Sequence, residues 1–162
     1  MPQYYTIHDT YEGMNLGLAT SLSEANAIVA ELNTLGSMSD RFQAYEYGDA
    51  PGLLDRLLEH ARAGRKMWRV TFIRTQFGVW QYDRAPIDYV VYCHRETTVN
   101  TFLTFCWAAS EHEAIAIAKE EFNELLPTID QAMELRNSGS VRTANELLGT
   151  TIRHYDNDHP IQ

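Results

Sequence analysis

The chain has 162 residues, a formal net charge of −9 and 44% hydrophobic residues, which is enough for one domain with a substantial core. It contains no run of about 18 apolar residues, and aromatic residues are abundant, which excludes a membrane span and wholesale disorder. The two cysteines, Cys93 and Cys106, are too few for a disulfide scaffold. We therefore expect a reduced, cytoplasmic protein without a signal peptide, a cofactor or a bound metal.

The first third of the chain predicts two strands, a capped helix and a third strand. Ser21 can accept a hydrogen bond at the start of the helix, and Glu24 three residues later completes a capping box. Apolar residues then recur at helical spacing as far as Gly36, which ends the helix. The predicted strands are at residues 3–8, 14–20 and 41–47.

The middle of the chain predicts a second helix, which begins near Pro51 and ends at Gly64, and then a long strand at 66–76. Gly78 indicates a hairpin that leads into a strand at 79–82, and residues 83–86 are expected to form a loop. Along the long strand, residues typical of a core alternate with residues typical of a surface, namely Trp68, Val70 and Phe72 with Arg69, Thr71 and Ile73.

The last part of the chain predicts two strong strands and a helix, followed by shorter elements. Ser110 and Glu113 form a second capping box, and Pro127 is expected to end the helix that they begin. The predicted strands are at 89–94, 101–107 and 151–155, and the two shorter helices are at 129–136 and 141–148.

A shift of 87 residues aligns seven identities between residues 4–31 and 91–118, including Ser23 with Ser110 and Ala27 with Ala114. Roughly two identities are expected at background residue frequencies. One interpretation is an internal repeat of two ββαβ units. The alternative is that Ser-Glu-x-x-Ala-Ile is simply a common start of a helix.

These elements predict an α+β fold with a mixed or antiparallel sheet flanked by four or five helices. We expect a single compact domain over residues 1–162. If the repeat is real, its copies are residues 1–50 and 88–156, joined by a helix and a strand at 51–87.

Charge is divided among three segments of the chain. Residues 1–55 carry eight acids and one base, residues 56–95 carry eight bases and three acids, and residues 96–162 carry eleven acids and four bases. One interpretation is that the basic centre pairs with the acidic ends inside the fold. The other is a bipolar surface with separate faces for anions and cations.

No sequence motif of a known catalytic site is present. Cys93 and His94 are neighbours on a predicted strand, so their side chains point to opposite faces and cannot pair with each other. Cys106 could contact His94 across the predicted hairpin, but only in one particular strand register. One alternative is therefore a small enzyme or ligand binder with its site around Cys93, His94 and Cys106. Cysteines on apolar strands usually serve in packing. The sequence contains no Cys-x-x-Cys pair of the kind that often binds structural zinc. We therefore expect a protein that is not an enzyme.

The basic middle segment gives a second alternative, a nucleic-acid-binding domain. Arginine neutralises phosphates, and exposed aromatic side chains stack on bases. The overall negative charge opposes such binding, and the alternation around Trp68 favours a core role for the aromatic residues. The candidate residues are Arg62, Arg65, Lys66, Arg69 and Arg74.

The acidic segments give the leading interpretation, a protein-binding module. Carboxylates placed on a rigid fold can imitate the phosphates of nucleic acid, with an attraction that depends on salt. We expect a small acidic inhibitor or adaptor that occupies the basic, nucleic-acid-handling surface of a protein partner, as an anti-defence protein of a phage or mobile element would. The alternative explanation of the charge is solubility alone. The candidate partner-binding residues are Asp49, Asp55, Glu120, Glu121 and Glu124.

Overall fold

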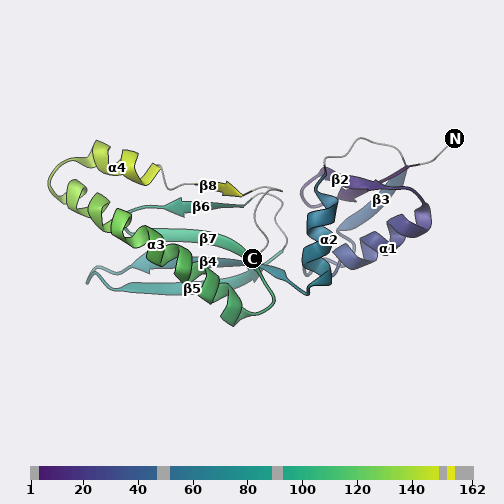
Figure 1. Cartoon of the computed structure of the whole chain (residues 1–162), viewed down its shortest axis with the longest axis horizontal. Helices are drawn as coiled ribbons and strands as arrows, with labels where there is room; N and C mark the ends of the chain where they lie inside the picture. The colour runs from purple at the N-terminus through teal and green to yellow at the C-terminus, as the bar shows by residue number, and fades with distance from the viewer. Residues whose placement is uncertain (1–3, 47–51, 89–92, 150–152, 156–162) are drawn as a thin grey trace. The chain divides into compact units, whose positions relative to one another are not determined.

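The computed structural model contains eight strands and four helices in the part of the chain that it describes, so the expected α+β class is confirmed (Figure 1). The strands form two separate sheets, of three and five strands, where the sequence analysis expected one sheet. The structure describes residues 4–46, 52–88, 93–149 and 153–155.

The chain divides into two compact units, each with its own core. The expectation of one domain over residues 1–162 stays a prediction. Of the described residues, the first unit comprises 4–46, 52–67, 87 and 88, and the second comprises 68–86, 93–149 and 153–155.

The first unit is built on a three-stranded antiparallel sheet with the order β2-β1-β3. Thr6, in the middle strand, lies opposite Leu18 on one side and Tyr45 on the other. The register of the first pair shifts between Ile7 and His8, where the second strand carries one extra residue. The strands are β1 (Tyr5–Asp9), β2 (Met14–Ala19) and β3 (Phe42–Glu46).

Two helices, α1 (Leu22–Leu32) and α2 (Leu54–Arg62), contribute apolar faces to the core of this unit. The second helix approaches the sheet closely at Gly17, where an added Cβ would lie 2.5 Å from the Cβ of Leu54. Hydrogen is therefore the only side chain that fits between this strand and this helix. The buried helical residues are Ala25, Ile28 and Leu32 of α1 and Leu54, Leu57, Leu58 and His60 of α2.

The second unit is built on a five-stranded sheet with the order β5-β4-β7-β6-β8, and one long helix lies across it (Figure 1). The outer strand β8 pairs antiparallel with β6, which in turn pairs antiparallel with β7. The strands are β4 (Lys66–Arg74), β5 (Trp80–Ile87), β6 (Cys93–Thr97), β7 (Thr101–Ala108) and β8 (Arg153–Tyr155), and the helices are α3 (Glu111–Asn137) and α4 (Val141–Gly149).

Aromatic rings fill the space between α3 and the sheet. Phe122 of the helix stacks on Phe72 with ring centroids 4.4 Å apart and meets the edge of Trp80 at 4.9 Å. Phe102 of β7 lies 5.8 Å from the same ring. The predicted alternation along β4 is confirmed at four positions, since Val70 and Phe72 are buried while Arg69 and Ile73 are exposed. Trp68 and Thr71 are half-buried.

The prediction that Pro127 ends a helix is wrong, because α3 continues through it to Asn137. Proline in a helix interior removes one backbone hydrogen bond and clashes with the preceding turn. Here the apolar stripe resumes beyond it, and both Ile129 and Ala132 are fully buried. Packing on the second core therefore outweighs the local cost.

The prediction of a loop at 83–86 is also wrong, because β5 runs without interruption to Ile87. This strand lies at the edge of its sheet, and proline is tolerated on an edge strand. Of the strand predicted at 89–94, residues 89–92 lie outside the described residues, and the described strand β6 covers Cys93–Thr97.

Both predicted helix caps are confirmed and have the same geometry. The hydroxyl oxygens of Ser21 and Ser110 accept hydrogen bonds from the backbone N–H groups of Glu24 and Glu113, each at 3.1 Å. Each glutamate returns a carboxylate oxygen to the backbone N–H of the residue before the serine, at 2.9 and 3.1 Å. The caps are 89 residues apart, whereas the 87-residue shift aligned Ser110 with Ser23.

Candidate functional site

Acidic side chains from the flanking segments hold four arginines of the basic centre. In each ion pair the arginine comes from residues 56–95 and the acid from 1–55 or 96–162, so the expected pairing of the centre with the ends is confirmed for these four. The pairs are Arg62 Nε with Glu31 Oε2 at 2.7 Å, Arg74 Nη2 with Asp130 Oδ1 at 3.1 Å, Arg95 Nη1 with Glu121 Oε2 at 3.6 Å, and Arg84 Nε with Glu111 Oε1.

The two exposed pairs also hold their arginines in the charged form. The hydrogen bond to Glu31, together with its negative charge, raises the pKa of Arg62 above its usual value. Glu111 raises the pKa of Arg84 in the same two ways. Both guanidinium groups stay positive at every physiological pH, and each has a carboxylate beside it.

This pairing leaves few of the candidate nucleic-acid-binding residues available. Arg62 and Arg74 are engaged by acids, and Arg74 also donates to the backbone oxygen of Val99 at 3.1 Å. Arg65 is half-buried, with its Nη1 3.5 Å from Nδ1 of His60. Across the described ranges, the exposed candidates without an ion pair are Lys66 and Arg69.

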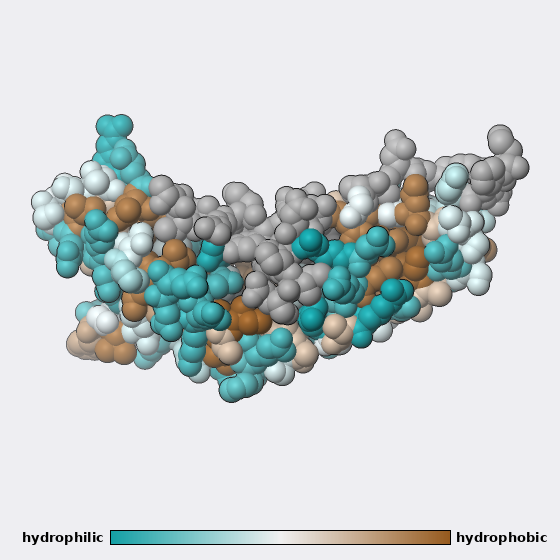
Figure 2. Space-filling view, in the orientation of Figure 1, coloured by the Kyte–Doolittle hydropathy of each residue, from teal (hydrophilic) through white to brown (hydrophobic). Residues whose placement is uncertain are grey.

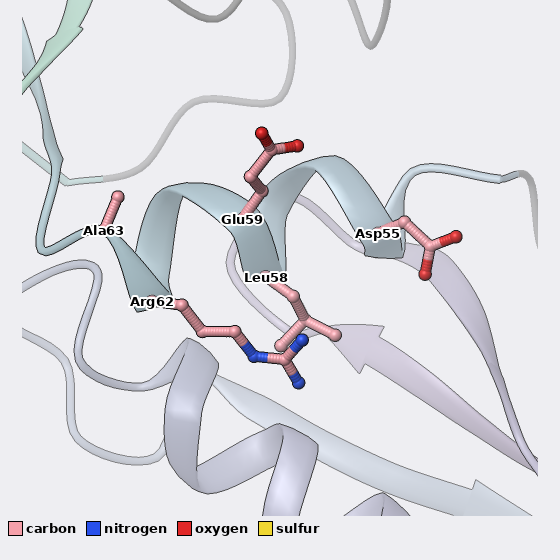
Figure 3. Close-up of a pocket in the computed structure, with 5 residues that line it drawn as sticks. All are labelled: Asp55, Leu58, Glu59, Arg62 and Ala63. Carbon is pink, nitrogen blue, oxygen red and sulfur yellow. The ribbon is translucent and has the colours of Figure 1, made fainter.

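On α2, two exposed carboxylates stand one helical turn apart, and we call Asp55 and Glu59 the α2 acid pair. They line a shallow concavity of about 570 Å³ together with Leu58, Arg62 and Ala63 (Figure 3). The carboxylate of Glu59 projects from the opposite side of the helix to Leu58 and Arg62. Neither acid forms a hydrogen bond or ion pair with the residues that the structure describes, although the charge of Asp55 contributes to the raised pKa of Arg62.

On α3, Glu120 and Glu124 form a second exposed pair at the same spacing, which we call the α3 acid pair. Within the described part of the chain, neither carboxylate has a hydrogen bond or a basic partner. Hydrophilic side chains cover much of the surface over this helix (Figure 2). Because like charges at this spacing repel each other, binding of a cationic partner would offset a small electrostatic repulsion between the two carboxylates.

The remaining acidic candidates are placed differently. Glu121 is half-buried, where its Oε2 accepts a hydrogen bond from Thr104 Oγ1 at 2.9 Å and pairs with Arg95. Glu121 therefore interacts with the interior of the second unit and is not part of the exposed α3 acid pair. Asp49 lies outside the described residues.

The third alternative, a site around Cys93, His94 and Cys106, gains no support from the geometry. Cys106 is 1% exposed, and its thiol lies 3.6 Å from the backbone oxygen of Ala114, as a packing cysteine would. The side chains of Cys93 and His94 lie outside the described part of the structure. Among the described residues, no three His, Cys, Asp or Glu side chains gather as metal ligands.

The acid pairs are therefore the arrangement that best fits a function. Glu59 was missed by the sequence analysis, although its distance of four residues from Asp55 on an amphipathic helix was a usable signal. Within the described ranges, no helix is both long enough and apolar enough to cross a bilayer. No family model, curated protein or solved structure matches this chain.

Proposed function

We propose that this protein is a non-enzymatic binding module that occupies a basic, nucleic-acid-handling surface of a protein partner. The observation that carries the proposal is the contrast between paired and unpaired charges. Four central arginines are held by acids of their own chain, whereas the α2 and α3 acid pairs have no basic partner among the described residues. The surface charge left over is negative, as a basic partner requires.

Electrostatic attraction would speed the association of the two proteins and make their affinity depend on salt. Opposite charge accelerates encounter, and salt screens exposed charges over about 8 to 10 Å at physiological ionic strength. Two carboxylates on adjacent turns lie about 5–6 Å apart at their Cβ atoms, so each acid pair presents a compact double charge. Arginine-rich surfaces that bind phosphates also accept carboxylates in this arrangement.

The first test is affinity capture with the full-length tagged chain from bacterial lysate, with and without nuclease. We expect one stoichiometric protein partner that survives nuclease and is released as salt rises. Such a partner is then purified, and its affinity for the chain is measured by calorimetry at several salt concentrations. Recovery of nucleic acid alone, or a partner whose affinity does not depend on salt, would overturn the proposal.

Isosteric variants then locate the contact. Asp55→Asn with Glu59→Gln, and Glu120→Gln with Glu124→Gln, each remove two charges and change little else. At least one of the two double variants should weaken partner binding tenfold or more without loss of stability. The matched control is Glu134→Gln, an exposed acid nearly three turns further along the same helix than Glu124.

A nucleic-acid-binding function remains the second candidate, because Lys66 and Arg69 are exposed and have no ion pair in the described part of the chain. It predicts that the protein binds a short oligonucleotide at low salt, and that Lys66→Ala with Arg69→Ala abolishes this binding. Unchanged binding in this double variant, or no binding by the wild type at low salt, would exclude it.

We also infer that the chain contains two related ββαβ units. In support, the strand order β2-β1-β3 is matched by β7-β6-β8, and all four strand pairs are antiparallel. The equivalent helices α1 and α3 both begin at a capping serine. The second unit differs by a longer helix, by α4, and by the hairpin β4–β5.

A further inference from the structure

The two cysteines of the chain belong to neighbouring strands of the second sheet. Cys93 begins β6, Cys106 lies in β7, and these strands run antiparallel side by side (Figure 1). Whether two such cysteines can form a bond depends on the register of the strands, because a shift of two residues moves their Cα atoms out of reach.

The hairpin turn between β6 and β7 fixes where the register starts. The backbone N–H of Thr98 donates to the backbone oxygen of Thr101 at 2.8 Å, so these two residues form a hydrogen-bonded pair. Thr97 lies opposite Phe102 as the next pair. Hydrogen-bonded and non-hydrogen-bonded pairs alternate along an antiparallel ladder, so Thr97 and Phe102 form a non-hydrogen-bonded pair.

Side-chain contacts extend the same register further from the turn. Glu96 lies opposite Leu103, so a regular ladder places Arg95 opposite Thr104. Both of these side chains reach Oε2 of Glu121 on α3, the Nη1 of Arg95 at 3.6 Å and the hydroxyl of Thr104 at 2.9 Å. This shared contact is what two directly opposed residues on one face of the sheet would make.

The next pair in this register is Cys93 with Cys106. Residues 93–95 pair one by one with residues 153–155 of β8, so these described residues of β6 carry no bulge that would shift the count. By the alternation, Cys93 and Cys106 occupy a non-hydrogen-bonded pair, like Thr97 four residues earlier in the ladder. Cα atoms in such a pair lie about 4.5 Å apart, within the range of about 4.4–6.8 Å that a disulfide spans.

We propose that Cys93 and Cys106 are a redox pair, which forms a reversible disulfide within one chain when the protein meets a hydroperoxide. The thiolate of one cysteine attacks the O–O bond, which gives a sulfenic acid and releases water. The second thiol then attacks the sulfenic sulfur, so that the S–S bond forms and the hydroxyl group leaves as a second water. Two thiols lose two electrons to one peroxide, and a small dithiol reverses the change by thiol–disulfide exchange.

The burial of Cys106 directs this chemistry to a partner within the chain. Cys106 is a free thiol, 1% exposed, and its Sγ lies 3.6 Å from the backbone oxygen of Ala114. A thiol buried in this way is shielded from the cysteines of other molecules, whereas the facing residue of β6 is already beside it. The bond would close the loop of residues 93–106 and tie β6 to β7 at the end far from the turn. The proposal uses neither acid pair, so it and the binding function can fail separately.

The test starts from the purified full-length chain, fully reduced and then freed of reductant. The folded protein is treated with an equimolar amount of hydrogen peroxide, and the remaining thiols are alkylated after unfolding. Intact mass and peptide mapping then show whether the two cysteines are linked within one chain. The matched control is Cys106→Ser with Thr104→Cys, which moves the second thiol two residues along the same face of β7. That position is diagonal to Cys93, about 7–8 Å away and out of reach of a disulfide.

We expect the wild type to lose about 2 Da, to yield a peptide linked between Cys93 and Cys106, and to regain both thiols with dithiothreitol. The control variant should form at least tenfold less of its linked peptide. Thiols that stay free or are oxidised without linking, a link between two chains, or an equal yield in the control would overturn the proposal. Circular dichroism establishes that the control is folded, and the linked peptide of the wild type decides the outcome if it is not.

Discussion

Arg41 and Asp9 form a buried two-pronged ion pair in the first unit. The Nε and Nη2 atoms of the guanidinium donate to the two carboxylate oxygens at 2.7 and 2.8 Å, and neither side chain is more than 1% exposed. Arg41 is the single basic residue among residues 1–55. Its burial against Asp9, with Glu12 Oε1 3.8 Å from Nη2, removes from the surface the one positive charge of this segment.

The first prediction concerns the cost of breaking this pair. Asp9→Asn removes the main partner of the buried Arg41, which keeps the more distant Glu12, and Arg41→Met removes the guanidinium from the buried Asp9. Breaking a buried ion pair from one side typically costs about 3–5 kcal/mol. The double variant Asp9→Leu with Arg41→Met removes both charges and should cost less than either single change. Urea unfolding of the three variants measures these differences. Single variants that lose less than about 1 kcal/mol would contradict the account of this pair.

The second prediction separates two serines near the start of α1. Ser21→Ala removes the side-chain acceptor of the cap and should lower stability by about 1 kcal/mol. Ser23→Ala, at an exposed position inside the helix, should be neutral or slightly stabilising because alanine favours helix. Thermal unfolding of the two variants measures the difference. The reverse order would show that the 87-residue alignment, rather than the cap at Ser21, marks the start of the helix.

The caps were predictable because their cause is local. A serine followed three residues later by glutamate satisfies the first backbone N–H groups of a helix wherever the helix lies. The path of the chain through Pro127 was not predictable in this way. The local preference of proline would end the helix there. The helix continues because it buries Ile129 and Ala132 in a core formed by residues distant in the sequence. The same holds for β5, where the edge position that tolerates Pro86 depends on the whole sheet.

The third prediction tests the close approach of α2 to the first sheet. Gly17→Ala would place a methyl group 2.5 Å from the Cβ of Leu54, so the helix must shift. Overpacking of this kind typically costs about 1–3 kcal/mol. Gly52→Ala is the control, since an added Cβ there meets no described atom within 4 Å. Equal stabilities of the two variants would contradict the described packing.

The fourth prediction follows from Asp88, whose Oδ1 accepts hydrogen bonds from the backbone N–H and the hydroxyl of Ser37, both at 2.8 Å. The backbone hydrogen bond, and then the hydroxyl, lower the pKa of this carboxyl. A lowered pKa contributes stability above the unfolded value of about 3.9, and this contribution is lost as pH falls through the folded value. Asp88→Asn should therefore be less stable than the wild type at pH 7.

The difference between Asp88→Asn and the wild type should disappear as both are acidified below pH 3. Unfolding in urea from pH 7 down to pH 2 provides the measurement. A stability difference that is constant over this whole range would show that ionisation of Asp88 contributes nothing.

The sequence predicted part of the candidate site. Charge segregation along the chain correctly indicated that arginines of the centre would meet acids of the ends, as Arg74 and Asp130 do. It did not distinguish Glu121 from Glu120, because neighbouring residues on a helix differ by about 100° in direction and the sequence does not show which direction meets Arg95. The roles of both acid pairs in binding stay predictions.

The most direct measurement of the central claim is a competition between this chain and nucleic acid for the captured partner. A fluorescent oligonucleotide is bound to the purified partner at low salt, and the full-length chain is titrated in. We predict stoichiometric displacement of the oligonucleotide, weakened in the variant of whichever acid pair makes the contact. A ternary complex in which the partner keeps its oligonucleotide would contradict the claim that the chain occupies a nucleic-acid-handling surface.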